Sequence, residues 1–222
     1  MLALRNELLL SVLNTSSASE RVDVVFDIYK QPSIKDAEKS RRSFTEGVRF
    51  SNIIPGHQIK QWKRLLSCGP SKMKLIAFIA DQWKTQPYRE RLGDKTMYVT
   101  SGENCTMITW ESTEVVGDLQ STQEEADNRL LLHCKHASSE FPSVIIAAED
   151  TYVFILCLAF QNVIGCKMFI RCGSSSRLRL IDVKKLASAL GVDVCKALIG
   201  FHAFTGCDTV SAFSGRGKGD CT

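Results

Sequence analysis

An acidic pair between two apolar runs is the feature of this sequence that most restricts its fold. Residues 144–148 form a short apolar run, Glu149 and Asp150 follow it, and a second apolar run begins at Tyr152. A short apolar run with a turn signal after it is typical of a buried strand, and the longer run indicates a helix packed on the sheet. We therefore predict a strand, a tight turn and a helix. Because sites in open parallel sheets gather at the carboxyl ends of strands, Asp150 occupies a predicted site position.

Strands and helices alternate along the rest of the sequence. Apolar patterns predict further strands near 21–27, 97–100, 106–110, 167–171 and 177–181. This alternation favours an α/β protein, with a three-layer α/β/α fold and a mostly parallel central sheet. Residues 33–85 have mainly helical spacing, so we predict a helical insertion after the first strand. A length of 222 residues with 44% hydrophobic content suits one domain over residues 1–222.

Composition limits the class of protein. The net charge of +4 is compatible with nucleic-acid binding but does not establish it. No apolar run reaches the length of about 18 residues that spans a bilayer, and Arg5 and Glu7 interrupt the apolar start, so we expect no membrane segment or signal peptide. The nine cysteines are scattered, and Cys157 and Cys195 fall inside apolar patterns. We interpret them as reduced thiols of an intracellular protein, for which a nuclear location is compatible.

Acidic residues recur where predicted elements meet. They follow two strands, open a helix and stand in a glycine turn, at Asp27, Glu124, Glu125, Asp127, Asp150 and Asp208. Carboxylates brought together repel, by roughly 4 kcal/mol for a pair about 4 Å apart at an effective dielectric near 20. A divalent cation such as Mg²⁺, which prefers oxygen ligands, would offset this repulsion. Such ions activate water and stabilise the charge on a phosphate under attack.

Each acid also has a purely structural interpretation. Asp150 and Asp208 can cap the helices that follow them, and Asp27 can be a turn residue at a strand end. Thr122 with Glu125, or Ser121 with Glu124, fits a capping box. Glu125 and Asp127 are two residues apart and would not share a face of a regular helix. The residues alone leave both interpretations open.

Two basic segments are candidate phosphate contacts. A helix that Ser33 can cap carries four basic residues, and the glycine-rich segment 215–219 carries two: Lys35, Lys39, Arg41, Arg42, Arg216 and Lys218. A solvated, basic helix face is the alternative for the first group.

Four short motifs occur in an order that resembles a known family. They are Val24-Val25-Phe26-Asp27, Glu125-Ala126-Asp127, Ala148-Glu149-Asp150-Thr151 and Gly206-Cys207-Asp208. Their ordered set resembles the acidic signature of the flap-endonuclease-like, PIN-like nucleases. The fuller wording at 123–127 and 202–209 is similar to a group of uncharacterised metazoan proteins often found with mobile elements. The resemblance covers about residues 21–218.

This resemblance implies a fold, a cofactor and a site. The fold would be Rossmann-like, with the 33–85 insertion as the arch region that handles single-stranded substrate. The site would be a phosphodiesterase centre dependent on Mg²⁺ or Mn²⁺, with catalytic, metal-binding carboxylates at Asp27, Glu125, Asp127, Asp150 and Asp208. The partner would be nucleic acid, either DNA or RNA, with DNA favoured. The 215–219 segment would begin a helix-hairpin-helix element, whose phosphate contacts carry no sequence information.

Three departures from the family pattern bear on activity. Tyr152 stands where the family has a further aspartate. No strand ending in aspartate precedes Arg21, and the chain stops where the hairpin element should continue. We therefore expect a domain truncated at both ends, or a decayed copy of a larger nuclease. Two functions stay open: a metal-dependent nuclease acting on branched or single-stranded nucleic acid, and a non-catalytic nucleic-acid-binding or protein-interaction module that keeps the fold.

Overall fold

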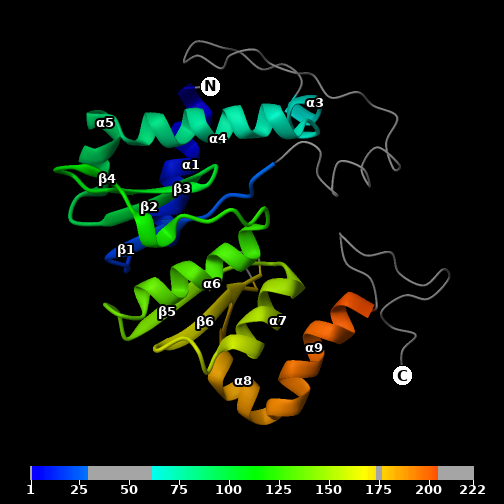
Figure 1. Cartoon of the computed structure of the whole chain (residues 1–222). Helices are drawn as coiled ribbons and strands as arrows, with labels where there is room; N and C mark the ends of the chain where they lie inside the picture. Colours follow the sequence, from blue (N-terminus) through cyan, green and yellow to red (C-terminus); the bar gives the residue numbers. More distant parts are fainter. Residues whose placement is uncertain (1, 30–61, 174–176, 205–222) are drawn as a thin grey trace. The chain divides into compact units, whose positions relative to one another are not determined.

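The computed structural model describes residues 2–29, 62–173 and 177–204 of the chain (Figure 1). The chain divides into two compact units, Met1–Ala126 and Asp127–Thr222, and each is described by itself. Both combine helices with a small sheet, four-stranded in the first unit and three-stranded in the second. The α/β class expected from the sequence is confirmed.

The first unit combines helices with the four-stranded sheet. Its elements are α1 (Leu2–Thr15), β1 (Arg21–Val24), α3 (Trp62–Leu66), α4 (Gly69–Trp83), α5 (Gln86–Arg89), η1 (Glu90–Leu92), β2 (Thr96–Ser101), β3 (Asn104–Ile108), β4 (Thr113–Val115) and η2 (Gly117–Leu119). The strand order is β1-β2-β3-β4. β1 and β2 are parallel, whereas β2, β3 and β4 form an antiparallel meander. Because the chain passes through α3 and α4 between β1 and β2, the parallel pair has a helical crossover.

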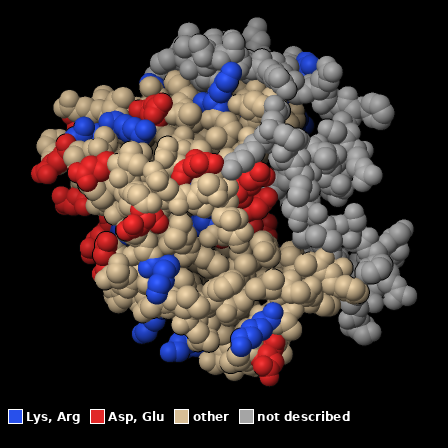
Figure 2. Space-filling view, in the orientation of Figure 1, with Lys and Arg blue, Asp and Glu red and all other residues tan. Residues whose placement is uncertain are grey.

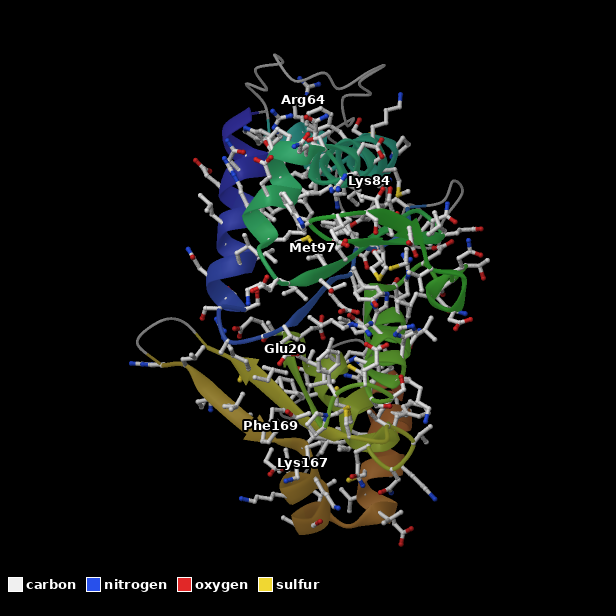
Figure 3. The ribbon with its side chains drawn as sticks, turned by 90° about the vertical axis from the view of Figure 1, so that its left-hand side faces the viewer. Glu20, Arg64, Lys84, Met97, Lys167 and Phe169 are labelled. Atoms are coloured by element: carbon white, nitrogen blue, oxygen red, sulfur yellow. The ribbon has the colours of Figure 1, made fainter. Side chains whose placement is uncertain are left out.

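One face of this sheet packs against helices to form the core of the first unit. Met97, Val99 and Ile108 are buried on it together with Leu9 of α1 and Trp83 of α4. Figure 3 labels Met97 on β2 beside these helices. Arg5 is buried here as well: its guanidinium donates to the side chain of Gln82 and lies over the ring of Tyr88, 5.2 Å from the centroid. Stacking of this kind lets a cation sit inside an otherwise apolar cluster.

Local sequence explains where the elements of this unit begin and turn. The sequence predicts that Gly69-Pro70 breaks a helix and that Ser71 starts the next; instead α4 begins at Gly69, and Pro70 lies in its first turn. Proline suits this position because its missing N–H would have no partner inside the helix. Gly102 joins β2 to β3 with φ +58°, which the turn of a two-residue hairpin requires and which glycine adopts without strain.

The second unit packs helices on a three-stranded sheet. Its elements are α6 (Ala126–Ala137, whose first residue belongs to the first unit), β5 (Ser143–Ala147), α7 (Thr151–Phe160), β6 (Lys167–Cys172), β7 (Arg179–Asp182), α8 (Val183–Leu190) and α9 (Val192–Phe204). β5 and β6 are parallel, and β6 and β7 are antiparallel. The predicted strand, turn and helix around Asp150 are therefore present as β5, residues 148–150 and α7.

The core of the second unit forms on one face of its sheet. Ile146, Met168 and Ile170 are buried there with Cys157 of α7 and Cys195 of α9. These two cysteines are small core residues, as the sequence predicts, and the cysteines in the described part of the chain are free thiols. Phe169, labelled on β6 in Figure 3, alternates with these residues and lies on the opposite face.

The sheets differ from the expected central sheet in number and in strand direction. The described strands form two mixed sheets, and three of their five strand pairs are antiparallel. The expectation of a mostly parallel sheet is not met among them, because the connections after β2, β3 and β6 have too few residues for a crossover to a parallel strand.

The predicted helical insertion falls partly on the described residues. Its later part contains α3 and α4, whereas residues 33–61 lie outside the described residues. Among the described helices none is long and apolar enough to cross a membrane alone, although α8 and α9, bent by 96°, pass on length and composition together.

Candidate functional site

Asp27 lies just beyond the carboxyl end of β1, in an extended segment that is fastened on several sides. The N–H of Phe26 donates to Thr100 Oγ1 (2.7 Å), and the N–H of Ile28 donates to the carbonyl of Glu124 (2.8 Å). These contacts hold the backbone on both sides of Asp27. The half-buried carboxylate of Asp27 is therefore attached to backbone whose position is fixed, unlike that of a residue at a loop tip.

Both oxygens of Asp27 accept hydrogen bonds. Oδ1 accepts from the backbone N–H of Ala126 (2.8 Å), and Oδ2 accepts from the hydroxyl of Tyr29 (3.0 Å). Ala126 is the first residue of α6, so Asp27 satisfies a helix-start N–H from a segment far away in the sequence. This is a different role from the strand-end turn residue that the sequence allows.

Tyr29 joins Asp27 to the start of α4. Its backbone N–H donates to the sulfur of Met73 (3.3 Å), and the ammonium of Lys72 lies over its ring, 4.6 Å from the centroid. Burial raises the pKa of Tyr29 above its ordinary value of 10.0, and the neighbouring charge of Asp27, the hydrogen bond to it and the charge of Glu125 act in the same direction. Tyr29 is therefore a neutral donor at physiological pH, and Glu125 lies near enough to the pair to act on it.

The position at which α6 begins excludes both capping boxes that the sequence allows. The helix begins at Ala126, so Ser121 and Thr122 lie too far upstream to be its N-cap. Ser121 instead accepts from the N–H of Gln123 (3.2 Å) in a local turn. Both capping-box alternatives are wrong, and Glu125 directly precedes the helix.

Asp150 caps α7, as the structural interpretation of the sequence predicts. Its Oδ1 accepts from the N–H of Tyr152 (2.7 Å), and its backbone is extended, as N-cap residues usually are. Glu149 accepts from the N–H of Gly173 after β6 (2.7 Å). Asp150 is exposed, so its second oxygen remains open to solvent or a ligand.

Tyr152 faces the last described helix. Its ring stacks on that of His202 in α9, with 5.1 Å between centroids and 14° between planes. His202 is buried at 8% exposure. The position at which the resembled family has a carboxylate is thus occupied by an aromatic pair that joins α7 to α9.

Of the remaining predicted site residues, only Asp127 lies among the described residues. Asp127 is half-buried in the first turn of α6 and belongs to the second unit. Outside the described residues lie Asp208 and all the predicted phosphate contacts, namely Lys35, Lys39, Arg41, Arg42, Arg216 and Lys218.

The carboxylates suit a hard cation chemically, but the described residues fit one only in part. Asp27 with Glu125 nearby in the first unit, and the exposed Asp150 in the second, offer the oxygen atoms that Mg²⁺ prefers. Within residues 2–29, 62–173 and 177–204, however, no three His, Cys, Asp or Glu side chains are grouped so as to hold a metal. We therefore assign no chemical step to a metal.

Comparison with known proteins adds no relative: no protein-family model, curated protein or solved structure matches the chain.

The residues that sequence reasoning missed are Tyr29 and His202. Tyr29 stands two residues after Asp27, a spacing at which an extended chain returns side chains to the same side, and this signal could have revealed it.

Proposed function

We propose that the chain is a nuclease-like protein related to the flap-endonuclease-like, PIN-like group, which hydrolyses phosphodiester bonds of DNA or RNA with Mg²⁺ or Mn²⁺. Its carboxylates are Asp27, Glu125, Asp127, Asp150 and Asp208, and its fold is the three-layer α/β/α arrangement of that group. One observation carries the proposal: an acid follows the outer strand of the parallel pair in each sheet, Asp27 after β1 and Asp150 after β5. Binding sites of open α/β sheets lie at such strand ends.

The hydrogen bonds of Asp27 support this proposal. A carboxylate that accepts from Tyr29 and Ala126 is held in one orientation and is partly removed from water. Such fixed charge is what a ligand site needs, since a side chain that must be ordered on binding costs free energy.

A second candidate is a module that binds nucleic acid without cleaving it. The stacked Tyr152 and His202 rings favour it, because Tyr152 cannot replace a carboxylate as ligand to a second metal ion. The cap hydrogen bond of Asp150 favours it too, since that bond stabilises α7 whether or not the protein cleaves nucleic acid.

Cleavage and binding of a labelled flap DNA in the presence of Mn²⁺ separate these functions. We compare the full chain with Asp150→Asn, and with Asp182→Asn as the matched control, because Asp182 caps α8 in the same way and is no part of the acidic signature. Cleavage by the parent and the control, lost in Asp150→Asn, supports the nuclease. Binding without cleavage in every variant supports the module, and absence of both refutes both.

Tyr152→Asp is the complementary variant. It supplies the carboxylate that the resembled family has at this position, so the nuclease proposal expects faster cleavage than that of the parent. A Tyr152→Phe variant controls for loss of the hydroxyl and should cleave like the parent.

A further inference from the structure

The hairpin of β3 and β4 ends the sheet of the first unit with an open edge. In the described sheet β4 pairs with β3 only, and all three of its residues are exposed. Two flanking backbone hydrogen bonds show which residue pairs of β3 and β4 are hydrogen-bonded and which are not. They run from Thr109 N–H to the Ser112 carbonyl and from Val116 N–H to the Cys105 carbonyl. Glu114 therefore turns its N–H and carbonyl toward β3, while Thr113 and Val115 turn theirs away from the sheet.

Two large apolar side chains stand exposed beside this edge. Val115 on β4 is 64% exposed, and Trp110 in the hairpin loop is 54% exposed. The loop is rigidly held: the guanidinium of Arg89 donates to the Trp110 carbonyl (2.6 Å from Nη2), and Ser112 N–H donates to Thr109 Oγ1 (3.0 Å). An exposed tryptophan on a backbone already fixed is the kind of residue that anchors protein partners, because little freedom is lost on binding.

The charge carried by the strands and turns next to the edge is of one sign, whereas Arg89 of α5 contributes a cation at the hairpin loop. Residues 96–118 contain no lysine or arginine, and their acids are all exposed: Glu103, Glu111, Glu114 and Asp118. Figure 2 shows acidic side chains on the side of the first unit where Figure 1 labels β4, with basic side chains beside them. The chain as a whole carries +4, so this negative surface is a local feature. It repels nucleic acid and acidic strands, and it attracts a basic segment.

We propose that the β4 edge is a docking site for an extended, basic segment of a partner protein, which adds to the sheet as a further strand. Backbone groups of Thr113 and Val115 bind the segment's backbone, Trp110 and Val115 contact its apolar side chains, and the surrounding carboxylates contact its lysines or arginines. Strand addition of this kind draws affinity from the main chain and specificity from alternate side chains. The glutamates also disfavour pairing of the open edge with an acidic strand, because like charges repel.

The test uses fluorescein-labelled alternating Lys-Val peptide, with alternating Glu-Val peptide as its charge-inverted control, in fluorescence anisotropy with the full chain. Val115→Pro removes an outward N–H while leaving the bonds between β3 and β4 in place, as edge strands tolerate. We expect Val115→Pro and Trp110→Ala each to weaken Lys-Val binding by at least about tenfold, which is ~1.4 kcal/mol. Leu10→Ala, which truncates an exposed apolar residue of α1, should leave binding unchanged.

Amide hydrogen exchange tests the same proposal without a substitution. The Lys-Val peptide should slow exchange at Thr113 and Val115, whereas Glu114 already has its partner on β3. Equal binding of both peptides, or Lys-Val binding that neither Val115→Pro nor Trp110→Ala weakens, would overturn the proposal in favour of general charge attraction. Self-association of the chain that Val115→Pro abolishes would overturn it in favour of a second copy, and absence of Lys-Val binding would overturn it outright.

Discussion

Cys157 makes the stability of the second unit depend on pH in a direction that can be worked out. The thiol is fully buried in α7, at 0% exposure, and burial raises its pKa from 9.0 to about 12. Above pH 9 the unfolded chain therefore releases a proton that the folded chain still holds. Because the unfolded state then binds fewer protons, stability falls as the pH rises from 9 toward 12.

The size of this effect follows from the same shift. Between the two pKa values each pH unit changes the free energy of unfolding by about 1.4 kcal/mol, so Cys157 lowers stability at about pH 10 by roughly that amount relative to about pH 8. Cys157→Ala removes the titration. Its own cost, a small cavity worth on the order of 1 kcal/mol, does not depend on pH.

Urea unfolding of parent and Cys157→Ala under reducing conditions, at pH values below and above the thiol's ordinary pKa, measures the difference. We expect the stability advantage of the parent to shrink by about 1.4 kcal/mol at the higher pH. Leu158→Ala is another truncation of a buried α7 residue, but it removes no titrating group. Its difference from the parent in the free energy of unfolding should therefore be the same at both pH values. A parent–Cys157→Ala gap that is the same at both pH values would refute the reasoning.

Four further substitutions test contacts described above. Asp150→Ala and Asp182→Ala each remove one cap hydrogen bond, of 2.7 and 3.0 Å, so each should cost about 1 kcal/mol in urea unfolding, and a cost near zero for either would contradict the cap assignment. Leu65→Ala empties a fully buried position in the first unit and should lower the unfolding free energy by about 2–5 kcal/mol; a melting temperature equal to the parent's would place Leu65 outside the core. Tyr29→Phe leaves the ring under Lys72 but removes the donor to Asp27, so calorimetric unfolding should show a loss of about 1 kcal/mol, whereas no loss would mean that the hydroxyl prefers water.

The parts of the fold that could be predicted from the sequence are those set by neighbouring residues. A capping role for Asp150 was one of the two interpretations that the sequence allowed, and Asp150 does cap α7, because an N-cap aspartate bonds an N–H only two or three residues away. The strand before Asp150 and the helix after it were recognisable for a similar reason: both consist of short apolar runs with one turn between them. β4 was missed because Thr-Glu-Val in a polar stretch has too few apolar residues to signal a strand, and it is exposed on an edge.

The parts that could not be predicted depend on contacts between distant residues. Nothing near Asp27 in the sequence indicates that its carboxylate bonds the N–H of Ala126, which lies 99 positions away. Arg5 was taken as an interruption of an apolar segment, yet it is buried, because its guanidinium donates to Gln82 and lies over the ring of Tyr88, both on other helices. Whether the five acids act together at a metal ion remains a prediction from the resemblance.

Metal binding by the full chain tests that central claim most directly. Titration calorimetry with Mg²⁺ and then Mn²⁺, on the parent, Asp150→Ala and Asp182→Ala, separates a ligand from a cap, because both variants lose a helix cap and only one loses an acid of the signature. Our account predicts saturable binding by the parent and by Asp182→Ala, and its loss in Asp150→Ala. Absence of binding by the parent, or equal binding by all three proteins, would contradict it and leave Asp150 as a helix cap.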